Sequence, residues 1–387
     1  MRPVDAAADD SAVHDIDPEA GRHGRRSMLR DLARERFGVD LAGLHPVVGG
    51  LDERARVWQG VGTDGSLWSL KSTRRDCRFG LALSASITEA GVDGVVGPRR
   101  ARDGLPWAEA RGSLVSLAPW IAGDDAVTAG PDSLSWEALG DTLRAIHSHP
   151  VPTTAVPVRR GIRRSGLPMQ MLLDDVDARL GQLAARTSAD EVEHSRRVEQ
   201  AWTAARGRLT ALARAERALK RHRTSVDRVP LHGDPHLGNV VVTADARPWL
   251  IDFDESTVAP REVDLMLVEL GVIFSAPVTD RQRASFRSGY GSLAVDDSRI
   301  ARFGCVRAIE DATATVLRLA DSRPDERDGL ASFLSGQLGP DGLVTLAEHA
   351  LLRLDDRQAL PHGALAAAPL PRPIDHPHTA HSRGHQR

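Results

Sequence analysis

The order of apolar and polar residues divides the chain into a β-rich front half and a helical back half. From Ser27, apolar residues recur at helical spacing and stop at Gly38. Alternating runs follow at 44–50, 55–61 and 66–71, and Asp64-Gly65 between the last two is a strong hairpin signal. A helix is expected at 79–89, with further short strands near the start of 97–107 and at 113–120. The front half is therefore predicted to be a small β-sheet with flanking helices.

After Gly123 the pattern becomes mostly helical. An amphipathic helix is expected at 135–149, ending before Pro150, and a long helical region at 169–223 with a break near 187–189. Between these helices and those nearer the C-terminus, residues 231–255 predict a strand end, a polar loop, and two strands joined by a turn. A β-rich front half, a helical back half and polar loops between them predict an α+β fold of two lobes around a cleft.

Both ends of the sequence lack periodicity, and we expect residues 1–26 and 359–387 to be disordered. The lobes are then expected at 27–118, for nucleotide binding, and at 119–358, for the catalytic loop and substrate site. A net charge of −3 gives no argument for a nucleic-acid or membrane partner. The longest apolar runs fall short of the ~20 residues that span a bilayer. The acidic start has no signal-peptide core, and two distant cysteines suggest no disulfide, so a reducing cytoplasm is expected.

The segment His232–Asn239, with the sequence HGDPHLGN, carries the first candidate chemistry. An Asp five residues before an Asn also suits an ordinary turn. The strand–turn–strand that follows, however, can return Asp252 to the neighbourhood of Asn239. An amide oxygen and a carboxylate are hard ligands suited to Mg²⁺, and Asp234 is left nearby as a third acidic group. Zinc binding by His232 and His236 is disfavoured, because they lie on a loop with Gly and Pro rather than on a helix.

Lysine usage sharpens this picture. Only Lys71 and Lys220 are lysines among 50 basic residues. A lysine retained under such a bias suits a site where a compact charge is needed, such as a phosphate site. Phosphoryl transfer requires a base for the attacking hydroxyl, an Asn and an Asp on magnesium, and a lysine on the third strand of a β-rich lobe. Asp234, Asn239, Asp252 and Lys71 supply these parts, which favours a kinase.

The pair formed by HGDPHLGN and the later IDFDE resembles the aminoglycoside phosphotransferase and choline kinase superfamily, over roughly residues 27–358. The segment IDFDESTVAPREVDLM, together with SGYG and AIED, resembles spectinomycin phosphotransferases within it. The resemblance implies a protein-kinase-like fold with a small β-rich N-lobe, a large helical C-lobe and the active site between them. It also implies ATP or GTP and Mg²⁺ as cofactors.

The same resemblance implies a role for each matching position. Asp234 would be the catalytic base, Asn239 and Asp252 the magnesium ligands, and Lys71 the phosphate holder. His232 and His236 would orient the loop. The backbone of Ser116, Leu117 and Ala118 would hydrogen-bond the nucleotide base. Gly49 and Gly50 would let the chain fold closely over the phosphates. The sequence departs from the family at one point: where kinases carry a Glu on the helix after the lysine strand, alignment places Arg78. Either Asp76 substitutes or the pair is absent.

The substrate is less defined than the chemistry. Aminocyclitol antibiotics are cationic, so their pocket should be acidic, and Asp254, Glu255, Glu310 and Asp311 are candidates. Asp264 is expected to anchor the loop instead. The leading hypothesis is an antibiotic kinase acting on spectinomycin or a related compound and giving resistance. The alternatives are a metabolic kinase of an amino alcohol, sugar or nucleoside, and a pseudokinase that binds nucleotide without turnover. A monomer is expected, with a dimer as the alternative.

Overall fold

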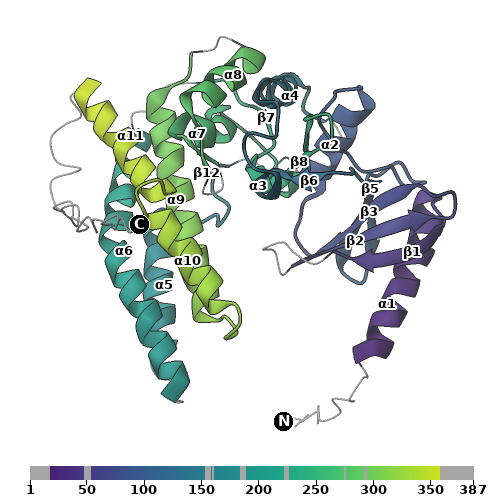
Figure 1. Cartoon of the computed structure of the whole chain (residues 1–387), viewed down its shortest axis with the longest axis horizontal. Coiled ribbons are helices and arrows are strands. Elements are labelled where there is room, and N and C mark those ends of the chain that lie inside the picture. Colours follow the sequence, from purple (N-terminus) through teal and green to yellow (C-terminus); the bar gives the residue numbers. More distant parts are fainter. Residues whose placement is uncertain are drawn as a thin grey trace, which may run out of the picture. The chain divides into compact units, whose positions relative to one another are not determined.

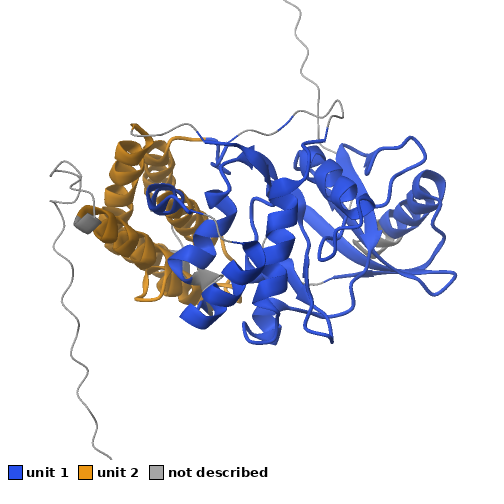
Figure 2. Ribbon diagram, turned by 90° about the horizontal axis from the view of Figure 1, so that it is seen from above, with its two compact units in different colours: residues 1–166, 224–303 blue, residues 167–223, 304–387 orange. Residues whose placement is uncertain are grey.

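The computed structural model describes residues 18–47, 54–152, 158, 161–183, 189–221, 226–273, 276–291 and 294–357. The chain divides into two compact units, residues 1–166 with 224–303, and residues 167–223 with 304–387 (Figure 2). The boundaries of these units differ from those of the lobes expected at 27–118 and 119–358. The lobe boundaries remain a prediction. All the residues proposed for phosphoryl transfer that the structure describes belong to the first unit.

An antiparallel sheet opens the first unit (Figure 1). Its strands are β1 (Leu41–Pro46), β2 (Ala55–Gly62), β3 (Leu67–Thr73), β4 (Ala108–Ala110) and β5 (Ser113–Pro119), in the order β1-β2-β3-β5-β4. The expected hairpin joins β2 to β3, with Gly65 at φ +82°, a backbone region that glycine enters without steric cost. Helix α1 (Pro18–Leu32) and the π-helical turn η1 (Ala33–Phe37) pack Leu29 and Phe37 against apolar residues of this sheet.

Two sequence predictions about this region are wrong. Helix α1 begins at Pro18, so residues 18–26, expected to be disordered, are helical. Proline is well suited to the first turn of a helix, where its missing N–H has no intrahelical partner. No strand forms at the start of 97–107; the strand that precedes β5 is β4, from Ala108 to Ala110. Residues 102–104 form a turn instead, closed by the bond from Ala101 N–H to Leu105 O.

The rest of the first unit frames the polar loops. After β6 (Asp124–Asp125) and α3 (Ala126–Ala129) comes α4 (Trp136–Ser148), whose N-cap Ser135 accepts the N–H of Ala138. Strand β7 (Val229–Leu231) pairs with β10 (Thr257–Ala259), and β8 (Val240–Val242) pairs with β9 (Pro248–Leu250). Short 3₁₀ turns, η2 (Leu237–Asn239) and η3 (Phe253–Glu255), follow the two polar loops. Helices α7 (Glu262–Leu270) and α8 (Asp280–Tyr290), with the hairpin β11 (Val272–Ile273) and β12 (Ala276–Pro277), come next.

The second unit is helical. It contains α5 (Met169–Leu183), α6 (Ala189–Arg221), α10 (Arg327–Leu338), α11 (Leu343–Arg357) and the part of α9 (Asp297–Ala320) that follows Phe303. Arg208 on α6 ties the unit together, donating to both carboxylate oxygens of Glu348 on α11, at 2.9 and 2.7 Å, and to the carbonyl of Leu338 at 2.8 Å. Within the described ranges, every helix is too short or too polar to cross a bilayer.

Candidate active site

The loop after β7 is fixed at its start by a buried carboxylate. Asp264, in the first turn of α7, accepts the backbone N–H of His232 and that of Gly233, each at 2.8 Å. Its Oδ2 also lies 3.0 Å from Nε2 of His147 on α4. Asp264 is 1% exposed, and a buried carboxylate with several donors is strongly held. Its geometry is that of the loop anchor expected from the sequence.

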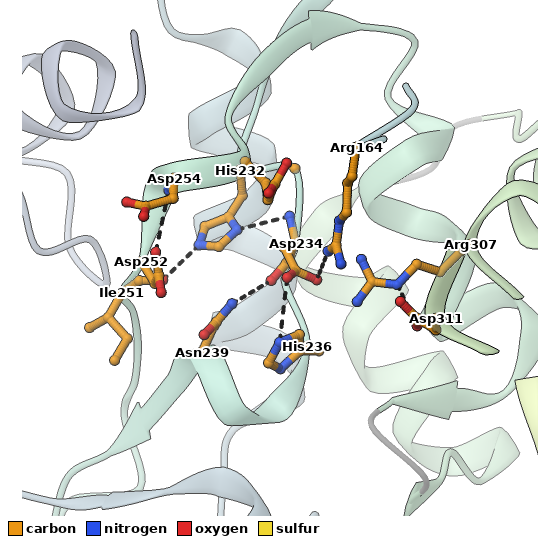
Figure 3. A network of polar contacts seen from close by, with 12 residues as sticks. Arg164, His232, Asp234, His236, Asn239, Ile251, Asp252, Asp254, Arg307 and Asp311 are labelled. Carbon is orange, nitrogen blue, oxygen red and sulfur yellow. Dashed lines mark hydrogen bonds and ion pairs between the residues drawn. The ribbon is translucent and has the colours of Figure 1, made fainter. Parts of the chain in front are cut away.

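The ring of His232 connects this loop to the segment after β9. Its Nδ1 accepts the N–H of Asp234 at 3.2 Å, and its Nε2 lies 2.9 Å from the carbonyl oxygen of Ile251. Because a carbonyl can only accept, Nε2 carries the proton and the ring is the neutral tautomer. Burial lowers the pKa of His232, which keeps it neutral. The side chain therefore holds two polar segments in register (Figure 3).

The β8–β9 hairpin brings Asn239 and Asp252 together, as the sequence predicted. Val240 pairs with Leu250, and one position further the N–H of Ile251 donates to the carbonyl of Asn239 at 3.0 Å. The side-chain Nδ2 of Asn239 donates to the backbone carbonyl of Asp234 at 3.0 Å. Asp252 has φ +61° and ψ +70°, a left-handed conformation unusual for a residue with a side chain. Such conformations concentrate at functional sites.

Lys71 on β3 reaches both acidic residues that follow β9. Its Nζ lies 2.8 Å from Oδ1 of Asp252 and 2.8 Å from Oδ2 of Asp254. The two carboxylates differ in exposure: the Asp252 side chain is 43% exposed and that of Asp254 only 7%. Lys71 therefore lies between one carboxylate open to solvent and one that is buried.

The pKa shifts follow this arrangement. Burial by itself would lower the pKa of Lys71, but Asp252 and Asp254 outweigh burial and raise it above its ordinary value. Burial likewise would raise the pKa of Asp252, but the ammonium of Lys71 lowers it. For Asp254, burial and the neighbouring charge of Asp252 act together and raise the pKa. The ammonium of Lys71 thus contacts both aspartates, but the pKa of Asp252 is lowered and that of Asp254 is raised.

Asp234 pairs with an arginine that sequence reasoning missed. The guanidinium Nη2 of Arg164 lies 2.5 Å from Oδ1 of Asp234, and Nε2 of His236 lies 3.5 Å from Oδ2 (Figure 3). Burial would raise the pKa of Asp234, but the charges of Arg164 and His236 prevail and hold it below its usual value. Asp234 is therefore a carboxylate that remains ionised. The only signal in the sequence was the basic cluster RRGIRR between two helices.

The residues expected to contact the nucleotide base and to close over the phosphates lie on β5 and outside the described residues, respectively. On β5, Ser116, Leu117 and Ala118 lie opposite Lys71, Leu70 and Ser69 of β3. The carbonyl of Leu117 accepts the N–H of Arg99 at 2.7 Å. Gly49 and Gly50 lie outside the described residues.

The four acidic candidates for the substrate pocket belong to two different compact units. Asp254 pairs with Lys71, and Glu255, 8% exposed, pairs with Arg75. Glu310 and Asp311 belong to the second compact unit, where Asp311 accepts Nε of Arg307 at 2.7 Å. Asp254 and Glu255 are therefore engaged by cations of the chain itself.

The helix carboxylate that would partner Lys71 is absent. Asp76 accepts Nε and Nη2 of Arg78, each at 2.7 Å, rather than approaching Lys71. Glu89, at the other end of α2 (Arg78–Glu89), pairs with Arg100. Of the two outcomes left open by the sequence, the structure shows the second.

Asn239 and Asp252 suit magnesium by their chemistry. Both offer hard oxygen atoms, and the hydrogen bond from the N–H of Ile251 to the carbonyl of Asn239 brings the residue before Asp252 beside Asn239. Within the described ranges, no group of three or more His, Cys, Asp or Glu side chains is arranged to hold a metal unaided. Magnesium commonly binds through one or two protein ligands and the phosphates of a substrate, so this donor set fits.

An antiparallel sheet followed by helices, with Lys71, Asp234, Asn239 and Asp252 in one unit, is typical of a protein-kinase-like phosphotransferase. A family model described as "Phosphotransferase enzyme family" matches residues 61–303. The chain belongs to this family, and it is an enzyme that transfers phosphoryl groups to hydroxyl groups of small molecules. The resemblance inferred from the motifs is confirmed. A comparison of the sequence with curated proteins finds no match.

Solved structures share the fold. Spectinomycin phosphotransferase in complex with ADP and spectinomycin matches with a TM-score of 0.70 and 19% identity, over 84% of this chain and 98% of that one. Its AMP-bound complex gives 0.67 and 18%, over 83% and 98%. An amicoumacin kinase in complex with AMP-PNP and Ca²⁺ gives 0.53 and 16%, over 84% and 97%. The predicted fold class is confirmed.

Proposed function

We propose that this chain is an ATP- or GTP-dependent kinase that phosphorylates a hydroxyl of a spectinomycin-like aminocyclitol antibiotic and so gives resistance. The observation that carries the proposal is the arrangement of Asp234, Asn239, Asp252 and Lys71 in one compact unit. The likeness to a solved spectinomycin phosphotransferase supports the choice of acceptor class. We further propose that the enzyme acts in the cytoplasm, where its two buried free thiols would stay reduced.

In this proposal Asp234 orients the acceptor hydroxyl and takes its proton as the oxygen attacks the γ-phosphorus. The bond from that phosphorus to the β–γ bridging oxygen breaks, and the nucleoside diphosphate leaves. Lys71 holds the α- and β-phosphates. Asn239 and Asp252 would hold magnesium, which when bound neutralises charge on the phosphate oxygens. His232 and His236 keep the loop in position, and the backbone of Ser116, Leu117 and Ala118 would contact the base.

The test is an acceptor-dependent assay of nucleoside diphosphate release, with mass spectrometry of the product. Release that requires spectinomycin, with a product heavier by one phosphoryl group, supports the proposal. Binding of magnesium-nucleotide without turnover of any acceptor would indicate the pseudokinase instead.

A second acceptor class is favoured by one observation, the Arg164 guanidinium on Asp234. A cation at the base disfavours a positively charged group on the acceptor at that point. With Asp254 and Glu255 occupied by Lys71 and Arg75, fewer carboxylates remain for a dicationic drug. A neutral sugar or nucleoside is therefore the second candidate. Turnover of neutral hydroxyl compounds in the absence of turnover of aminocyclitols would select it.

A further inference from the structure

The side chain of Lys71, which holds the phosphates in the proposed mechanism, must itself be fixed in one position. A free lysine side chain has many rotamers, and misplacing a catalytic group by about 1 Å can cost roughly 100-fold in rate. Kinases usually fix the strand lysine with a glutamate on the next helix. Here the first turn of α2 has no acidic residue, and Asp76 and Glu89 are paired with Arg78 and Arg100. The fixing carboxylate must come from elsewhere.

Among the described residues, two carboxylates contact Lys71, and only one of them can serve this purpose. Asp252, 43% exposed, is the proposed magnesium ligand, so its oxygens are committed to the cation during turnover. Asp254, 7% exposed, is buried against the same ammonium at the same 2.8 Å distance. A buried ion pair with fixed geometry orients its partner far better than an exposed one does.

The turn that carries Asp254 is itself firmly placed. A Cβ at Gly80 of α2 would collide with the carbonyl oxygen of Phe253, and a Cβ at Gly233 would collide with that of Glu255. The backbones of α2 and of the catalytic loop therefore contact η3 directly. The next residue, Glu255, pairs with Arg75 and not with Lys71. The position of Asp254 is thus determined from both sides.

We propose that Asp254 is the positioning residue for Lys71 and supplies, from the turn after β9, the carboxylate that other kinases supply from a helix. The inference rests on the proposed function. Lys71 keeps its contact with Asp254 when Asp252 binds the cation, so the ammonium stays aimed at the phosphates. This role replaces the substrate-binding role expected of Asp254 from the sequence.

The experiment measures the affinity for magnesium-ADP by calorimetry and steady-state kinetics with a responsive acceptor. Asp254→Asn keeps the shape of the side chain and removes its charge. We expect about tenfold to 100-fold weaker nucleotide binding and a matching rise in the KM for ATP. The KM for the acceptor should change less than about twofold, because Lys71 does not contact the acceptor. A variant that disturbed only the general packing of the protein would raise the KM for ATP and the KM for the acceptor alike.

Glu255→Gln is the matched control. Glu255 lies on the same turn, is buried like Asp254, and pairs with Arg75 instead of Lys71. We expect this variant to lose comparable thermal stability but to weaken nucleotide binding by less than about threefold. Equal losses of nucleotide affinity in the two variants would overturn the proposed role of Asp254.

A rescue variant separates positioning from structure. Cys77 is the N-cap residue of α2 and lies close to Asp254 and Lys71. Burial, followed by the charge of Asp254, raises the pKa of its thiol to about 12, and the charge of Lys71 acts in the opposite direction. Aspartate is a favoured N-cap residue. Cys77→Asp combined with Asp254→Asn restores a carboxylate beside Lys71 from the helix side. We expect this double variant to regain about tenfold in nucleotide affinity; no regain contradicts the inference.

These measurements distinguish failure of the proposed function from failure of the proposed role of Asp254. A wild-type protein that binds no nucleotide overturns the proposed function and, with it, this inference. A wild-type protein that binds nucleotide as tightly as Asp254→Asn overturns the inference alone. Should Asp254→Asn fail to fold, the double variant carries the test, because it should bind within about tenfold of the wild type.

Discussion

The carboxylate of Asp264 accepts the backbone N–H of His232 at 2.8 Å, across 32 positions of sequence. The N–H of Gly233 donates a second hydrogen bond to this carboxylate, and the two bonds together fix the direction in which the loop His232–Asn239 leaves β7. The loop's geometry therefore depends on a residue that contacts neither nucleotide nor acceptor in the proposed mechanism.

We predict that Asp264→Asn destabilises the protein by about 2–4 kcal/mol, because the amide presents a donor to one of two buried N–H groups and leaves it unsatisfied. Urea unfolding would measure the loss. Asp141→Asn is the control: its 60% exposed side chain pairs with Arg144 on the surface, and the change should stay within about 0.5 kcal/mol. Similar losses in both variants would contradict the anchoring role.

Asp234→Asn tests the base. The amide keeps the shape of the side chain but cannot accept a proton, so we predict a kcat lower by about 100-fold to 10,000-fold. Nucleotide affinity should change less than about threefold, because Asp234 faces the acceptor in the proposed mechanism. Rapid-quench kinetics and calorimetry would measure the two quantities. Near-normal turnover would show that another group is the base.

Arg164→Met tests the pair that holds Asp234 ionised. The variant removes the charge that offsets burial, so the pKa of Asp234 should rise. The base is active only when deprotonated, and its pKa sets the acid limb of the rate profile. We therefore predict that this limb moves to higher pH, as measured by kcat/KM between about pH 5 and pH 8. Arg163→Met, on the preceding position, is the control, and an unshifted limb in Arg164→Met would contradict the assignment.

Local signals made much of the fold predictable. The hairpin at Asp64-Gly65 set the register that places Lys71 on β3. The strand–turn–strand pattern after Asn239 was enough to predict that Asp252 returns to the neighbourhood of Asn239. These features depend on neighbours in sequence, where turn chemistry and period-two patterns act directly.

The missed features depend on long-range approach. Arg164 lies in a segment without periodicity, so nothing local indicates that its guanidinium reaches Asp234. The partner of Lys71 was sought on α2, where kinases carry it, but the approach of η3 to that helix brings Asp254 there instead. That approach depends on Gly80, which within an apolar helical run reads as an ordinary weak helix residue.

Gly80→Ala tests this approach directly. On helix propensity alone, alanine should stabilise α2 by up to about 1 kcal/mol. Here the added Cβ collides with the backbone carbonyl of Phe253, which cannot move as a flexible side chain would. We predict a net destabilisation of about 1–3 kcal/mol and weaker nucleotide binding, because a displaced η3 carries Asp254 away from Lys71.

Gly207→Ala is the matched control for that substitution. Gly207 also lies within a helix, α6, but a Cβ there would meet nothing within 4 Å. Relief of the backbone entropy cost should therefore stabilise the protein by about 0.5–1 kcal/mol and leave nucleotide binding unchanged. Thermal unfolding and calorimetry on both variants decide the matter. If Gly80→Ala stabilises the protein as Gly207→Ala does, the close contact between α2 and η3 does not exist in solution, and the placement of Asp254 loses its support.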